Sequence, residues 1–67
     1  MEFKIGNRVM VNISVLAVEG VDLGGVTEAP GKIFATPGGE LCNVRLDEPV
    51  AGYSVFYNVN PNVLRSI

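Results

Sequence analysis

The chain has 67 residues, of which 48% are apolar and 18% are charged, and its formal net charge is −2. The high apolar fraction excludes a disordered acidic tail, and the modest, aperiodic Gly and Pro content excludes collagen-like and low-complexity chains. The acidic balance disfavours non-specific binding to nucleic acid, which draws its affinity from Lys and Arg, although a few basic residues could still gather on one face.

A single small domain spanning residues 1–67 is expected, and its core must be thin, because so short a chain buries only ~60% of its unfolded surface. Cys42 is the only cysteine, so no intrachain disulfide can form. The longest apolar run, residues 15–18, is too short for a membrane helix or the core of a signal peptide. We therefore expect a cytoplasmic protein in a reducing compartment, without membrane contact.

The composition favours strands. Eleven Val and four Ile stand beside five Leu and four Ala, and no stretch combines helix-forming residues at helical spacing with caps. No helix longer than one turn is predicted. The first strand is expected to begin at Arg8 and to alternate along residues 8–15. The alternation then changes phase, which a bulge or sharp bend near Val15 and Leu16 would explain.

A long connection over residues 19–30 is predicted next, because it contains three glycines and few strand-forming residues. Residues 31–36 are typical of a short second strand. The type II turn predicted after it, over residues 36–39, uses Pro37 to preset the first central residue and Gly38 to accept the positive φ of the second.

The third strand is predicted over residues 41–46, with Asp47-Glu48-Pro49 ending it. The fourth strand is predicted over residues 53–59. A turn at residues 60–62 then separates it from a short last strand over residues 63–67. The predicted core consists of Val9, Val11, Ile33, Val44, Leu46 and Val55, while Cys42 also faces inward.

The fourth strand carries apolar residues on both faces. Tyr53, Val55 and Tyr57 share one face, and Phe56 lies on the other. Because a thin core can cover only one face, Phe56, and also Met10 on the first strand, are expected to meet another surface; isolated exposed hydrophobes are the alternative. Phe56, Tyr57 and Met10 are the predicted partner or ligand contacts. A homo-oligomer is expected, because small chains without disulfides or metals often gain burial by assembling.

The sequence offers little catalytic chemistry. It has no histidine, which removes the usual general base, the usual zinc ligand and every Ser-His or Cys-His pair. Cys42 is interpreted as a buried thiol, Asp47 and Glu48 as turn residues, and the Gly-Gly pairs as turns without phosphate-binding spacing. No catalytic residue, metal site or resident cofactor is predicted.

The order of elements resembles a five-stranded SH3-like barrel, an all-β fold with a long first loop and a 3₁₀ turn before the last strand. The residues that carry the resemblance are Ile5-Gly6-Asn7-Arg8-Val9, Gly31-Lys32-Ile33, Val44-Arg45-Leu46-Asp47 and Val63-Leu64.

Within that fold, Ser54-Val55-Phe56-Tyr57 is similar to a stretch of the plasmid- and integron-borne type II dihydrofolate reductases. The resemblance implies a homotetramer around a pore that binds NADPH and dihydrofolate, encoded on a mobile element such as a cassette or phage. The family's pore residues include a Gln, an Ile and a Tyr on this stretch and a Lys on the first strand. Only Tyr57 matches, since Phe56 occupies that region and no Lys lies between Lys4 and Lys32.

We therefore expect a non-enzymatic binding or assembly module, an oligomeric small β barrel of unknown ligand. One alternative is an NADPH-dependent reductase resembling the type II dihydrofolate reductases, in which the oligomer creates the site and the cofactor supplies the chemistry. The other is a nucleic-acid-binding barrel, which the acidic charge disfavours.

Overall fold

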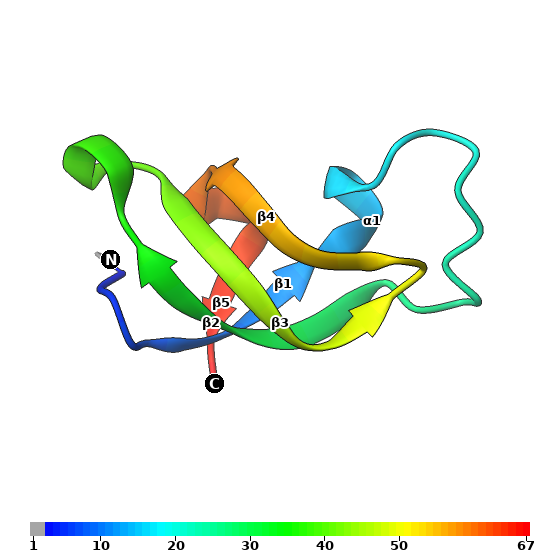
Figure 1. Cartoon of the computed structure of the whole chain (residues 1–67), viewed down its shortest axis with the longest axis horizontal. Coiled ribbons are helices and arrows are strands. Elements are labelled where there is room, and N and C mark those ends of the chain that lie inside the picture. The colour runs from blue at the N-terminus through cyan, green and yellow to red at the C-terminus, as the bar shows by residue number, and fades with distance from the viewer. Residues whose placement is uncertain (1–2) are drawn as a thin grey trace.

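The computed structural model describes residues 3–67 and shows an antiparallel all-β chain with little helix (Figure 1). Its elements are β1 (Arg8–Asn12), α1 (Ile13–Leu16), β2 (Glu28–Ala35), η1 (Pro37–Gly39), β3 (Cys42–Val50), β4 (Tyr53–Val59), η2 (Pro61–Val63) and β5 (Leu64–Ser66). The helix α1 is a single turn, η2 is a 3₁₀ turn, and η1 is a tight turn in which Gly38 departs from helical geometry. The predicted absence of any longer helix is confirmed for the described residues.

The five strands form one sheet in the order β4-β3-β2-β1-β5. Strands β2, β3 and β4 make a meander, and β5 returns to pair with β1 on the far side. The long connection between α1 and β2 projects beyond the sheet (Figure 1). Strands β4 and β5 stand at the two ends of the order and are not paired with each other within residues 3–67. The sheet is open there, so the predicted closure of a barrel is not confirmed.

The core lies on one face of this curved sheet, because each strand alternates inward apolar residues with outward polar ones. On β1, Val9 and Val11 are buried while Arg8 is exposed; on β2, Ile33 is buried between two exposed neighbours. The described core consists of Val9, Val11, Ile13, Ala29, Ile33, Cys42, Val44, Leu46, Phe56, Val59 and Leu64. Five of the six predicted core positions are confirmed. The prediction that Val55 belongs to the core is wrong, because its side chain is only partly buried.

The change of phase predicted near Val15 and Leu16 is produced by a helical turn rather than a bulge. β1 ends at Asn12, and α1 follows directly. Within that turn Ile13 is buried and Leu16, three residues later, packs against the core, whereas Val15 is exposed. Helical spacing therefore replaces alternation, and the strand is shorter than predicted.

Two strands extend further than predicted, and each tolerates a proline for a structural reason. β2 begins at Glu28, and Pro30 lies opposite Met10 of β1 before the pairing with β3 starts at Gly31. Pro30 therefore has a partner strand on one side only. At such an edge position the N–H that proline lacks removes the fewest hydrogen bonds from the sheet. β3 runs through Pro49 to Val50, because the β3–β4 register shifts between Arg45 and Val50 and removes regular pairing there.

A bulge in β4 reverses the predicted face of Phe56. The register shifts from Val44 opposite Phe56 to Cys42 opposite Val59, which places three steps of β4 against two of β3. Asn58 takes a φ of 55° within this bulge, and its N–H donates to Asn43 Oδ1 at 2.8 Å. Phe56 and Val59 consequently both point into the core. The expectation that Phe56 lies outside the core is wrong, since only 9% of it is exposed.

The turn predicted at residues 36–39 is confirmed by its geometry. Gly38 adopts φ 67° and ψ 0°, the values of the second central residue of a type II turn, and the Gly39 N–H donates to the Thr36 carbonyl at 2.9 Å. The turn after β4 is also present as η2. There the Asn60 side chain accepts a hydrogen bond from the Asn62 N–H at 2.9 Å.

The backbone of β2 at Gly31 lies close against β3. A Cβ placed on this buried residue would lie 2.6 Å from the Arg45 carbonyl oxygen and 3.1 Å from Val44 Cγ1. Since a backbone atom cannot move aside as a side chain does, only glycine fits this position without shifting the two strands.

Replacing Gly31 by Ala should therefore lower the free energy of unfolding by about 1–3 kcal/mol, the usual cost of overpacking. Urea titration followed by circular dichroism measures this change. Ser54→Ala, at an exposed position on β4, serves as control and should stay within about 0.5 kcal/mol of the parent protein. Equal stability of Gly31→Ala and the parent would contradict the close approach.

Val44 tests the inward face of β3. It is fully buried, and an unpaired carboxylate there costs several kcal/mol or must protonate. A chain of this length has a total stability of about 3–10 kcal/mol. Val44→Asp should therefore unfold the protein, whereas Arg45→Asp, one residue later on the exposed face, should leave the strand spectrum intact. A folded Val44→Asp protein would show that the inward face is assigned wrongly.

Candidate functional site

The outer face of the sheet brings together basic and aromatic side chains from three strands. Lys32 of β2 lies opposite Arg45 of β3, and Phe34 follows Lys32 on the same face of β2. Tyr57 joins them from β4. We call the four residues Lys32, Phe34, Arg45 and Tyr57 the basic-aromatic face. The four side chains share the outer face because successive residues of a strand point to opposite faces, and each of the four is next in sequence to an inward residue, Ile33, Val44 or Phe56.

The rings and the guanidinium of this face are in contact. The Phe34 and Tyr57 ring centroids lie 6.1 Å apart with the rings at 86°, an edge-to-face arrangement. The Arg45 Cζ atom lies 5.5 Å from the Phe34 centroid, within cation–π range. Phe34 is 37% exposed and Tyr57 is 67% exposed, so the cluster holds the Phe34 ring in place and leaves much of the Tyr57 ring open to solvent.

Charge is distributed unevenly over the fold. Two of the cations that β1 and β5 present are neutralised by ion pairs. Arg8 forms a bidentate pair with Asp47 of β3, and Arg65 of β5 binds Glu28 at 3.2 Å. Lys32 and Arg45 have no carboxylate within 4.0 Å among residues 3–67. The basic-aromatic face therefore keeps two uncompensated positive charges, although the chain as a whole is acidic.

The Arg8–Asp47 pair reaches across β2, because Arg8 is on β1 and Asp47 is on β3. The hydrogen bond and charge of Arg8 lower the pKa of the Asp47 carboxyl below its ordinary value of 3.8, and the same contact raises the pKa of the Arg8 guanidinium. Both side chains remain substantially exposed. The pair therefore links three strands on the outer face while adding no free charge to it.

The three residues predicted as contacts do not form one site. Tyr57 is exposed and belongs to the basic-aromatic face. Phe56 points the other way, into the core, where it stacks on Tyr53 with centroids 5.3 Å apart. Met10 lies on the outer face of β1, half-buried, with β2 and β3 between it and Tyr57. The structure thus retains Tyr57 as a surface residue and assigns Phe56 to packing.

Phe34, Lys32 and Arg45 were not singled out as site residues by the sequence, although a signal was available. Ile33 is apolar and inward, so alternation alone places Lys32 and Phe34 on the opposite face. What alternation cannot show is that Tyr57 contacts Phe34. That contact depends on the register of β2, β3 and β4, which is set by long-range pairing.

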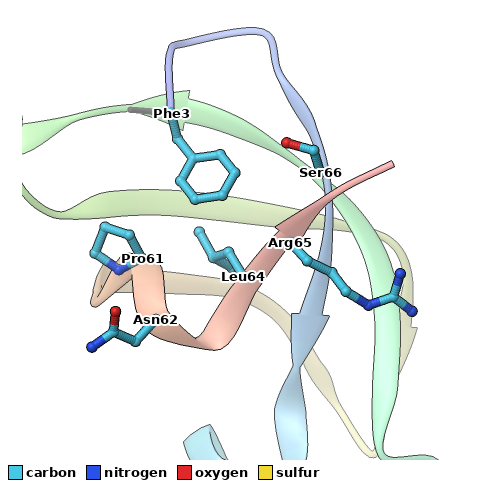
Figure 2. A pocket seen from close by; sticks show the side chains of 6 residues that line it. All are labelled: Phe3, Pro61, Asn62, Leu64, Arg65 and Ser66. Carbon is cyan, nitrogen blue, oxygen red and sulfur yellow. The ribbon is translucent and has the colours of Figure 1, made fainter. Parts of the chain in front are cut away.

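A shallow pocket of about 400 Å³ lies beside β5, lined by Phe3, Pro61, Asn62, Leu64, Arg65 and Ser66. In Figure 2 the Phe3 ring lies over Leu64, with Pro61 beside it, and the Arg65 guanidinium extends away from the hollow. Arg65 is held by Glu28. The hollow is a packing groove between the N-terminal segment and η2, without a charged side chain directed into it.

A second hollow of about 450 Å³ lies between the start of β2 and the end of β3. Its lining includes the carboxylates Glu28, Asp47 and Glu48, together with Pro30 and Pro49. Glu28 and Asp47 are already paired with arginines. No group of three or more His, Cys, Asp or Glu side chains able to hold a metal is found within residues 3–67.

Cys42 is buried, as predicted, on the inward face of β3. Desolvation raises the pKa of its thiol, which disfavours the reactive thiolate. In the same described range, no helix is long and apolar enough to span a membrane.

The residues do not fit a site of the dihydrofolate reductase type. Of the residues that the resemblance implicates, Tyr57 alone is present and exposed, Phe56 is inside the core, and the outward positions of β1 are Arg8, Met10 and Asn12 rather than a lysine. No protein-family model, curated protein or solved structure matches the chain.

The Arg8–Asp47 pair generates a pH prediction. Because the folded state lowers the pKa of Asp47, the pair stabilises the fold above pH 3.8 and loses this effect as the pH falls through the lowered value. Asp47→Asn should therefore be less stable than the parent in urea at pH 7, and the difference should shrink below pH 3.8. Glu48→Gln, which changes a carboxylate without an ion pair in the described residues, is the control. A difference that grows in acid would contradict the prediction.

Proposed function

We propose that this protein is a non-enzymatic binding and assembly module, a small SH3-like barrel that works as a homo-oligomer in the cytoplasm. The observation that carries the proposal is the number of large apolar side chains left exposed in so short a chain. They are Ile5, Val15, Val18, Val21, Val26, Phe34, Tyr57 and Ile67.

The arrangement of elements supports the barrel. A long first loop, the meander β2-β3-β4, a 3₁₀ turn and a last strand that pairs with β1 follow the order of a small SH3-like barrel. Function does not follow from that order, because small barrels serve many purposes. The surface is what favours binding over catalysis here, since the described outer face presents rings and cations in contact.

Six of these eight exposed hydrophobes fall into two groups. Val15, Val18, Val21 and Val26 lie on α1 and the first loop, which projects from the sheet (Figure 1). Phe34 and Tyr57 lie on the outer face of the sheet. A thin core without a disulfide gains from burying the first group against a second copy, which leaves the basic-aromatic face for a ligand.

Sedimentation velocity at about 100 μM tests the assembly, since a micromolar Kd would then populate oligomers. The parent protein should run above the 7.1 kDa mass of one chain, and Val18→Ser should lower the mass, because it removes an exposed apolar contact at 67% exposure. Ile5→Ser, at a similarly exposed position outside the loop, is the matched control and should leave the mass unchanged.

Two results would contradict the proposal. A parent protein that sediments as a monomer would exclude micromolar assembly. A loss of mass with Ile5→Ser but not with Val18→Ser would show that the first loop is not the contact. In each case circular dichroism confirms that the strand content is retained.

A further inference from the structure

We propose that the basic-aromatic face binds single-stranded nucleic acid, with Lys32 and Arg45 contacting phosphates and the Tyr57 ring stacking on a base. The inference rests on the proposed binding function and names the ligand class of that surface. Single-strand binders combine cations that follow the backbone with aromatic rings on which bases stack. This face has both within one contact network of three adjacent strands.

The cations are arranged in a row across three strands, and two of the three have no carboxylate partner within residues 3–67. Arg8 lies opposite Lys32, and Lys32 lies opposite Arg45, so three positive residues face outward in register on β1, β2 and β3. Like charges directly opposite each other destabilise a sheet. Asp47 compensates Arg8, but Lys32 and Arg45 have no carboxylate partner within residues 3–67. An anion that lies across β2 and β3 would relieve this repulsion.

The aromatic part of the face offers an exposed ring on which a planar group can stack. The Phe34 ring contacts both the Arg45 guanidinium and the Tyr57 ring. Tyr57 is supported by this contact on one side and is 67% exposed. A ring that is held by its neighbours loses little conformational freedom on binding, which favours stacking.

The face discriminates between classes of anion. An acidic peptide would neutralise Lys32 and Arg45 but would give the Tyr57 ring no planar partner. Duplex DNA keeps its bases stacked and paired, so it also leaves the ring unused. A single strand supplies phosphates and unpaired bases at neighbouring positions, and it is the ligand that uses all four residues of the face.

The acidic composition does not oppose this reading, because Glu28 of β2 and Asp47 of β3 are already paired with Arg65 and Arg8, and Glu48 lies near the end of β3. Of the five Lys and Arg residues of the chain, Arg8, Lys32, Arg45 and Arg65 lie on strands of the sheet. Glu19, Asp22 and Glu40 lie in the first loop and at the end of η1. The surrounding acidic surface limits binding to the one face and makes it weak and short-ranged.

Fluorescence anisotropy with a labelled oligothymidine of about 12 nucleotides tests the inference at about 50 and about 200 mM salt. We expect the logarithm of affinity to fall with the logarithm of salt concentration with a slope of about −1.4, since two phosphates are neutralised. Tyr57→Ser should weaken binding about 5- to 150-fold, the range for losing one stacked base. Lys32→Gln and Arg45→Gln should each reduce the slope by about 0.7.

Lys4→Gln is the matched control, because it removes the same charge at an exposed position outside the sheet, and it should change the affinity by less than about twofold. The duplex of the same length and a poly-glutamate competitor separate the other ligand classes. Equal affinity for duplex and single strand, full displacement by poly-glutamate at equal charge, or unchanged binding by Tyr57→Ser would each overturn the inference.

The two proposals fail separately. Sedimentation of the parent protein as an oligomer that does not retain the oligonucleotide would overturn the ligand assignment and leave the assembly standing. A monomer that binds the oligonucleotide with the expected dependence on Tyr57 would overturn the assembly and support the ligand assignment.

Discussion

A single sheet of this size can cover only one of its faces, and that limit shapes the rest of the molecule. The inward residues of β1, β2 and β3, such as Val11, Ile33 and Val44, fill the space enclosed by the curved sheet. At Gly31 the strands lie so close that a side chain there would strike the backbone of β3. The side chains on the other face contact water, form ion pairs or remain available to a partner.

The outer face uses its exposed residues in two different ways. Toward β5, the pairs Arg8–Asp47 and Arg65–Glu28 cross strands and cancel charge. Exposed pairs of this kind contribute little stability, so their main effect is on the surface potential. Toward β4, Lys32 and Arg45 stay uncompensated beside two rings in contact. This asymmetry within a single face is the physical basis for assigning one end of it to a ligand.

The bulge in β4 links the core to this surface. By inserting one residue near Asn58, it rotates Phe56 and Val59 inward together. Tyr57 remains outward and meets Phe34 of β2, two strands away. Without the bulge, strict alternation would put Phe56 and Val59 on opposite faces. The same local irregularity therefore supplies a large side chain to a thin core and leaves the aromatic pair at the surface.

The sequence by itself determined the strand-rich class, the turns at residues 36–39 and 60–62, the inward parity of β1 and β3 and the burial of Cys42, because these depend on local alternation and on Gly, Pro and Asn at specific positions. The tertiary structure decided the rest. Whether Phe56 faces the core depends on the β3–β4 register, and whether Arg45 and Tyr57 meet Phe34 depends on pairing between residues far apart in the chain. The continuation of β2 and β3 through prolines likewise depends on where partner strands end. Register is a long-range property, so no local pattern in this sequence could specify it.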